Sequence, residues 1–229
     1  KNGDVVVILS SSSFPGLILN TIAALDAMKI RHVMVLSLGA STWGADEPAI
    51  AWYRMTRMLK KGGLCFSAGD YYTPGGDGEN GGGLPAESLE DMRRLSKKAG
   101  VEFIVKRSVA ETVSWKMNLI HAVKPKAVIN IGGSNANMGE DVAVLELAPG
   151  LLTDKRLSAG NGVIGMALSE GYPVIHLLNL KKLCTMTGVP FDAPQEMSLK
   201  SGRTTVCSLL GVVVFACLLI RFSRWKIGS

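Results

Sequence analysis

Four consecutive serines follow the first apolar segment of the chain. Residues 4–9 read DVVVIL, and Pro15 comes shortly after the serines. The β-branched run predicts a strand buried on both faces, and proline favours the first turn of a helix. Hydroxyl and backbone N–H groups at a helix N-terminus can hold a phosphate, a carboxylate or an oxyanion. The alternative is that a serine only caps the helix. The candidate ligand-binding residues of this turn are Ser10, Ser11, Ser12 and Ser13.

Glycines and amides follow a later apolar run. Residues 127–131 (AVINI) predict another strand, which leads directly into two glycines. Glycine permits positive φ and lets the backbone approach a ligand closely, and the neighbouring amides and hydroxyls supply neutral hydrogen bonds. The second predicted strand also ends in a polar turn. The candidate ligand-binding residues of these two turns are Asn130, Gly132, Gly133 and Ser134, with Ser41 and Thr42.

Three titratable residues are candidates for acid–base catalysis, and each has a structural alternative. Asp46 precedes Glu47 and Pro48, so it can instead cap the next helix. Asp77 lies in the glycine-rich segment GGDGENGGG, where a solvated turn residue is expected. His176 lies inside the apolar run PVIHLL, where a buried histidine bonded to a carbonyl is the alternative to a general base.

Several familiar site signatures are missing from the sequence. It contains no GxxxxGK[ST], no GxGxxG after the first strand and no GxSxG. No CxxC or His/Cys cluster indicates a metal, and no cofactor is identified. Of 25 Lys and Arg residues, three lie in 221–229, which leaves 22 against 19 Asp and Glu, or +3, for residues 1–203. This mild charge gives no support to nucleic-acid binding.

Apolar runs and helical patterns alternate along the chain. They predict an α/β fold with a mostly parallel, doubly wound sheet of five or six βα units. The unusual loops 10–13, 39–46, 69–83 and 132–139 all follow strands, so we expect them to meet at the carboxyl ends of the strands. Predicted strands cover 4–9, 32–38, 64–68, 101–105, 127–131 and 173–178. Predicted helices cover 15–29, 48–61, 85–98, 109–122, 160–170 and a short helix capped by Asn179 and ended by Gly188.

The C-terminal part of the sequence predicts a transmembrane helix. Residues 204–220 are seventeen uncharged positions, TTVCSLLGVVVFACLLI, and Arg221, Arg224, Trp225 and Lys226 follow. This length is at the short limit for a span, and a basic, aromatic flank suits a membrane interface. Basic residues favour the cytoplasmic side of a span, so the tail favours an extracytoplasmic main domain. The bias is small, because three basic residues follow the segment and two, Lys200 and Arg203, precede it. A tail-anchored cytoplasmic domain is the alternative. The expected domains are 1–194 (α/β domain), 195–203 (linker), 204–220 (span) and 221–229 (basic tail).

Several segments together resemble one family, the bacterial poly-γ-glutamate system proteins of the PgsW type. The resemblance is collinear over residues 3–194. One departure lies in the serine turn, where the glycine of the family's SGSFP is Ser11 or Ser12. The similar segments are 3–5 with 10–15, 39–45 with Pro48 and Trp52, 75–77 with 83–84, 128–133, and 171–178.

The resemblance implies an envelope protein encoded with genes for poly-γ-glutamate synthesis or export, with an N-terminal anchor ahead of this chain. The expected function is that of a membrane-anchored accessory protein of capsule production that binds an anionic ligand. The expected partners are the membrane and poly-γ-glutamate or its synthase and export subunits. Two alternatives are an enzyme acting on a phosphorylated or γ-glutamyl small molecule, and a non-catalytic scaffold for synthase subunits.

Overall fold

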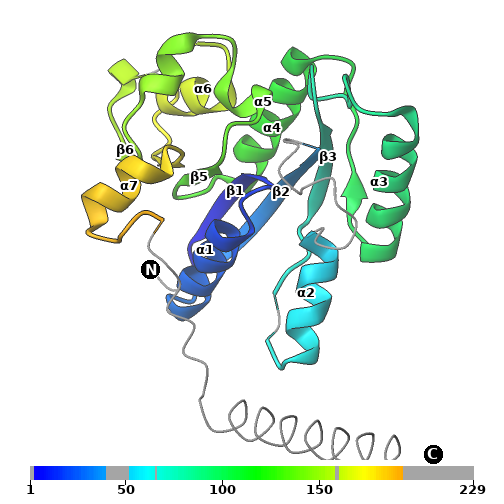
Figure 1. Ribbon diagram of the computed structural model, residues 1–229. Helices are drawn as coiled ribbons and strands as arrows, with labels where there is room; N and C mark the ends of the chain where they lie inside the picture. The colour runs from blue at the N-terminus through cyan, green and yellow to red at the C-terminus, as the bar shows by residue number, and fades with distance from the viewer. Residues whose placement is uncertain (1–2, 40–51, 65, 158–159, 193–229) are drawn as a thin grey trace, which may run out of the picture. The chain divides into compact units, whose positions relative to one another are not determined.

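A mostly parallel β-sheet forms the centre of the molecule. The computed structural model describes residues 3–39, 52–64, 66–157 and 160–192 (Figure 1). In these ranges seven strands are ordered β4-β3-β2-β1-β5-β7-β6, and β6 alone runs antiparallel to its neighbour. The strands are β1 Val5–Ser11, β2 Arg31–Gly39, β3 Tyr71–Gly75, β4 Glu102–Phe103, β5 Val128–Ile131, β6 Gly150–Leu152 and β7 Val174–Leu177.

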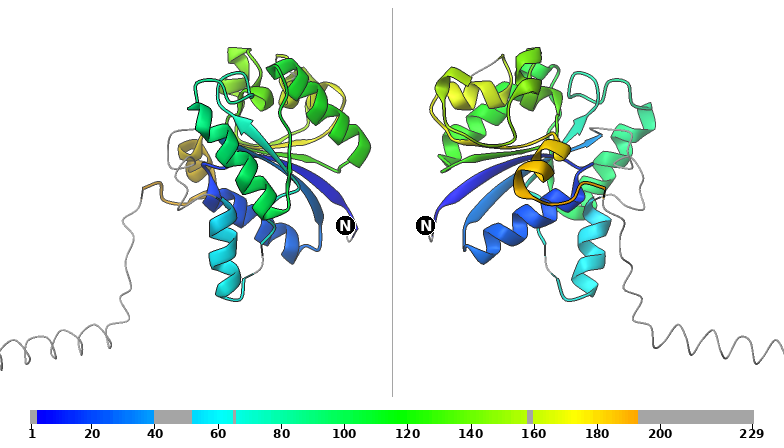
Figure 2. Two further views of the ribbon diagram at one scale, coloured as in Figure 1. Left: turned by 90° about the vertical axis from the view of Figure 1, so that its right-hand side faces the viewer. Right: turned by 60° about the vertical axis from the view of Figure 1, so that its left-hand side comes forward.

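Helices cover both faces of this sheet, as expected for a doubly wound fold (Figure 2). The helices are α1 Pro15–Ala27, α2 Trp52–Lys61, α3 Ala86–Ala99, α4 Val109–Val123, α5 Asn135–Met138, α6 Val163–Ser169 and α7 Leu180–Thr187, with 3₁₀ turns η1 Val142–Glu146 and η2 Lys155–Leu157.

Strand residues alternate between two apolar cores. Val7 and Leu9 of β1 pack with α4, α5 and α6 in a core on what we call the α4 side of the sheet. Val6 and Ile8 pack with α1, α2 and α3 on the other side, the α1 side. The alternation follows from the period of two of a β-strand, and burial on both faces explains the continuous apolar run of β1.

The predicted α/β class is confirmed, but the third strand was placed wrongly. Residues 64–68 were expected to form a weak strand, whereas the described part of that segment forms none. Strand β3 lies instead within the segment expected to be a loop, 69–83. Its pattern is short and ends in Pro74 and Gly75, which weaken a strand signal.

Smaller differences occur at the ends of elements. Strand β4 has two residues where five were expected, and α6 begins three residues late, at Val163. The edge strand β6 and the one-turn helix α5 were not predicted. The short last helix is confirmed: the Asn179 side chain accepts a hydrogen bond from the Lys182 N–H at 3.2 Å, and Gly188 ends α7.

The predicted span at 204–220 lies outside the described residues. Within the ranges that the structure does describe, no helix has the length and apolar character needed to cross a bilayer. The chain divides into two compact units, Lys1–Val189 and Pro190–Ser229. This division lies a few residues before the predicted end of the α/β domain at 194.

Candidate functional site

The carboxyl ends of β1 and β5 define the candidate site. Strand β1 pairs with β2 on one side and with β5 on the other, so the order of the strands reverses between β1 and β5. Open α/β sheets bind ligands in the crevice at such a reversal. Ser10 is in register with Ile131, and a Cβ built on Gly132 would lie 3.0 Å from the Ser11 Cβ. The structure therefore brings together the serine turn and the Gly132 turn.

The serine hydroxyls do not cap α1. The N-cap residue is Phe14, and no side chain accepts a hydrogen bond from the first turn. The hydroxyls stabilise the turn instead: Ser12 donates to the Leu38 carbonyl at 2.7 Å, and the Ser11 and Ser13 hydroxyl oxygens lie 2.6 Å apart. The capping alternative is therefore wrong, because these hydroxyls already have other partners.

Only part of this turn lies at the surface. Ser10, Ser11 and Ser12 are buried, and Ser10 donates to the Ser11 carbonyl at 3.1 Å. Ser13 is half-buried, and Gly16 in the first turn of α1 is exposed. The groups available to a ligand are therefore the Ser13 hydroxyl and the N-terminal end of α1.

Gly132 has a positive φ of 83°, and its missing side chain makes room for an aromatic ring. A Cβ at this position would lie 2.8 Å from the Phe14 ring and would clash with it. Gly132 is buried, whereas Gly133 is exposed. Backbone access at this turn is thus offered by Gly133, while Gly132 allows Phe14 to pack between the two turns.

Asn130 and His176 lie below the surface in one hydrogen-bonded network on the α4 side. The Asn130 amide nitrogen donates to the Gly132 carbonyl at 2.8 Å and lies 3.2 Å from Nδ1 of His176. Asn137 donates to the Asn130 side-chain oxygen at 2.9 Å. Burial lowers the pKa of His176, which favours the neutral ring. His176 is therefore a buried residue, as the alternative proposed, but its partner is an amide.

The same network ends in a buried ion pair that the sequence did not reveal. Lys116 of α4 donates to the Asn137 side-chain oxygen at 2.8 Å, and its Nζ lies 3.9 Å from Oε2 of Glu79. The other Glu79 oxygen accepts from the Ala136 N–H at 3.2 Å. Both charged residues are 1% exposed. Burial lowers the pKa of Lys116, and the Glu79 carboxylate opposes this effect.

The glycine-rich loop after β3 buries Glu79 and leaves Asp77 exposed to solvent. The Asp77 and Gly82 backbones exchange two hydrogen bonds, at 2.8 and 3.2 Å, which close the loop on itself. Asp77 is exposed, whereas Glu79, with a φ of 58°, is buried against α5. The structure does not bring Asp77 and His176 together as a catalytic pair, because one faces solvent and the other lies in the core.

Of the remaining predicted site residues, the structure describes only Ser134. Ser134 is the N-cap of α5, where its hydroxyl accepts from the Asn137 N–H at 3.4 Å. Ser41, Thr42 and Asp46 lie outside the described residues. Within the described ranges, no group of three or more His, Cys, Asp or Glu residues could hold a metal ion.

Three buried oxygens of this region make no hydrogen bond to the described protein atoms. They are Ser37 Oγ, Thr73 Oγ1 and Glu79 Oε2. Ser11, Ser37 and Thr73 occupy one register row across β1, β2 and β3, so their side chains share the α4 side. Buried oxygens of this kind are usually satisfied by ordered water. We therefore expect ordered water beside these three oxygens.

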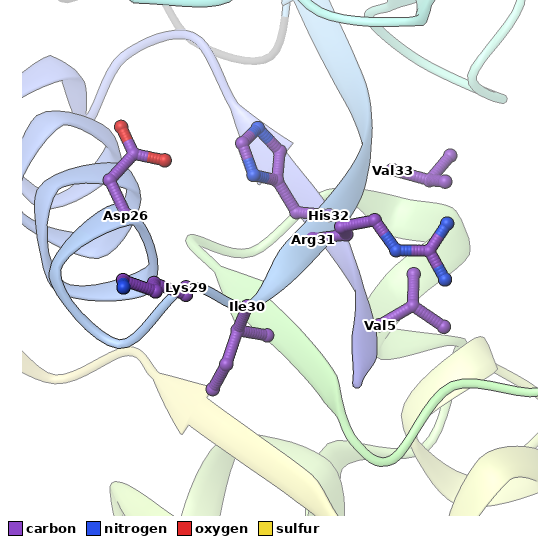
Figure 3. Close-up of a pocket in the computed structure, with 7 residues that line it drawn as sticks. All are labelled: Val5, Asp26, Lys29, Ile30, Arg31, His32 and Val33. Carbon is purple, nitrogen blue, oxygen red and sulfur yellow. The ribbon is translucent and has the colours of Figure 1, made fainter. Parts of the chain in front are cut away.

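An open pocket lies at the opposite end of the sheet (Figure 3). It is lined by Val5, Asp26, Lys29, Ile30, Arg31, His32 and Val33, at the amino ends of β1 and β2. In Figure 3 the charged side chains come from α1 (Asp26), from the turn after it (Lys29) and from the start of β2 (Arg31), and they do not converge on one point. We therefore place the candidate site at the carboxyl ends, where the polar residues are organised.

Comparisons with known proteins add no further assignment. No protein-family model, curated protein or solved structure matches this chain. The class that the structure itself defines is a doubly wound α/β protein with a candidate site at the reversal of its strand order.

Proposed function

We propose that this chain is a membrane-anchored accessory protein of poly-γ-glutamate production that binds anionic groups at the N-terminus of α1. One observation carries the binding site: the first turn of α1 has no side-chain cap, although four serines precede it. An uncapped N-terminus at the reversal of the strand order combines free N–H groups with the positive end of a helix dipole. The resemblance of the sequence to poly-γ-glutamate system proteins motivates the choice of γ-linked glutamyl carboxylates as the ligand.

Each residue of the turn has a distinct part in this proposal. The Ser13 hydroxyl and the N–H groups of Gly16 and Leu17 donate to a carboxylate or phosphate. Ser12 is already engaged with the Leu38 carbonyl and holds the turn against β2. Gly133 supplies a second stretch of exposed backbone across the crevice.

Substitution of Gly16 tests the binding site. No heavy atom outside its chain neighbours lies within 4 Å of a Cβ at Gly16, so a side chain fits there. Gly16→Glu puts a carboxylate in the first turn, where it is favourable for the helix and competes with an external anion. Gly16→Gln is the uncharged control of similar size.

Binding of a short γ-glutamyl oligomer and of inorganic phosphate to the full chain is measured by calorimetry at low salt. We expect Gly16→Glu to weaken binding at least tenfold, Gly16→Gln to retain it, and 0.5 M salt to reduce it in the parent protein. Equal binding by the two variants, or no binding by the parent protein, contradicts the proposal. Loss of function on exchange of 204–220 for another spanning segment, with no effect of Gly16→Glu, favours the scaffold alternative.

The enzyme alternative has one observation in its favour, the buried polar network. Two of its members, Lys116 and His176, have lowered pKa values, and perturbed pKa values are typical of active sites. Its test is hydrolysis of γ-glutamyl and phosphorylated substrates by the parent protein, Asp77→Asn and His176→Gln. Turnover that His176→Gln abolishes, with ligand affinity retained, would establish the enzyme.

A further inference from the structure

Helix α2 presents a basic face to solvent. Arg54, Arg57, Met58 and Lys61 follow the spacing i, i+3, i+4, i+7, which places them on one side of a helix, and all four are exposed. The opposite side of α2 buries Trp52 and Thr56 in the core on the α1 side. In Figure 1, α2 lies at the lower side of the molecule, with its C-terminal end directed away from the sheet.

The positive charge of this face is not neutralised. Helix α2 has four basic residues and no acidic residue, and no ion pair joins them to an acidic side chain in the described part of the chain. Helix α3 differs, because its Arg94 contacts Glu90 and Asp91, each at 3.4 Å. The Tyr53 hydroxyl donates to the Lys98 carbonyl at 3.0 Å, so the basic C-terminal turn of α3 adjoins the start of α2.

Apolar side chains stand among these cations. Met58 is 68% exposed, and Leu64, just after the helix, is 54% exposed. A dissolved polyanion would satisfy the cations and leave both apolar side chains in water. A bilayer of anionic phospholipid satisfies both groups, since headgroup phosphates attract the cations and the acyl boundary accepts Met58 and Leu64.

We propose that the outer face of α2, formed by Arg54, Arg57, Met58 and Lys61, docks on an anionic phospholipid surface. The segment 193–203 has eleven residues, so a spanning segment at 204–220 would keep the last described residue, Asp192, within about 40 Å of the bilayer. A short tether of this kind raises the effective concentration of the surface and strengthens a weak contact. This tethering rests on the proposed membrane anchoring, whereas the charge and exposure of α2 do not.

The test observes Met58 directly. The full chain, labelled with ¹³C at the methionine methyl groups, is placed in nanodiscs that contain a gadolinium-chelating lipid and either 30% phosphatidylglycerol in phosphatidylcholine or phosphatidylcholine alone. Met28 at the C-cap of α1 is the internal control, because it is 64% exposed and lies outside α2. We expect the Met58 methyl signal to broaden several-fold more than that of Met28 in the anionic discs, and the difference to vanish in the neutral discs.

A pair of matched variants separates the α2 face from overall charge. R54Q/R57Q/K61Q removes the three cations of the face, whereas K126Q/K155Q/K181Q removes three exposed lysines elsewhere. Only the first variant should abolish the selective broadening of Met58. Equal broadening of Met28 and Met58, or an equal effect of the two variants, overturns the proposal.

Co-elution of the chain with the nanodiscs reports separately on anchoring. If the chain does not co-elute with the neutral phosphatidylcholine discs, the proposed span is wrong. The same methyl measurement with phosphatidylglycerol vesicles that contain the gadolinium-chelating lipid then still decides whether α2 docks. Selective broadening of Met58 by those vesicles supports the proposal without an anchor, and its absence overturns it.

Discussion

The two sides of the sheet differ sharply at the carboxyl ends of the strands. On the α1 side, Leu36 of β2 and Ile131 of β5 are buried and apolar, and Ser10 of β1 is the buried polar residue in register with them. On the α4 side, the positions next to them are Ser37 and Asn130, and His176 continues the polar set on β7. A polar residue in a core costs stability unless it is hydrogen-bonded. The Ser37 and Thr73 hydroxyls, which have no partner among the described protein atoms, both lie on the α4 side. Substitutions of polar core residues should therefore change stability most on the α4 side.

The largest difference in stability between substitutions on the two sides of the sheet is expected at the buried ion pair. Lys116→Met leaves the Glu79 carboxylate buried without its cation, which should lower the free energy of unfolding by about 3–5 kcal/mol. Met34→Leu, a change of similar volume on the α1 side, should cost less than about 1.5 kcal/mol. Urea denaturation measures both values.

The double variant Lys116→Met/Glu79→Gln is the control for the charge. It should recover a large part of the loss, because no unpaired charge remains. A loss that persists in the double variant would show that Lys116 contributes through packing and hydrogen bonding to Asn137, and that the ion pair itself contributes little.

The pH dependence of stability should also differ between the two sides, because the α4 side contains the buried His176. Its pKa is lowered by burial, so between the lowered value and about 6.5 the unfolded chain binds more protons than the folded one. The contribution of His176 to the free energy of unfolding should therefore be fully present above about pH 6.5. It should decrease as the pH falls below this value, by at most about 1.4 kcal/mol per pH unit. Denaturation curves from pH 5 to 8 test this.

His176→Gln should remove that part of the pH dependence, and His32→Gln, at a partly exposed position on β2, should keep it. Identical pH profiles for all three proteins would show that the buried ring on β7 does not govern acid sensitivity.

The smallest effect is expected at Ser37 and Thr73, the two hydroxyls that have no partner among the described protein atoms. Thr73→Val keeps the shape of the side chain and removes an oxygen that has no hydrogen bond to described protein atoms. If water satisfies this oxygen, the change should cost about 1 kcal/mol or less, and a high-resolution crystal structure should show ordered water beside Ser37, Thr73 and Glu79. Absence of ordered water beside these atoms, together with a stabilising effect of Thr73→Val, would contradict this expectation.

The alternation of strands and helices could be predicted, because the sequence contains clear apolar runs for the strands and clear helical spacing of apolar residues between them. The convergence of the serine turn and the Gly132 turn then followed from the rule that parallel strands end at one edge. Strand β3 could not be placed, because its few β-forming residues run directly into Pro74 and Gly75. Local pattern therefore sufficed for the fold class and for which loops meet.

The buried ion pair could not be predicted, because its two members come from distant segments. Lys116 lies among apolar helix positions, where a lysine would be expected to reach solvent, and Glu79 lies in a glycine-rich loop that suggests solvated turns. The burial of these two residues depends on α4, α5 and the loop after β3 meeting in space. The capping alternative for the serines was wrong for a similar reason, since the Ser12 partner, Leu38, belongs to the next strand.

The outermost strands of the sheet have a consequence for self-association. Strands β4 and β6 contain only two and three residues, so each edge exposes few free backbone groups to a second chain. Such short edges are poor templates for strand addition and protect a sheet against edge-to-edge aggregation. Self-association of this domain by addition of strands at the β4 or the β6 edge should therefore be unfavourable.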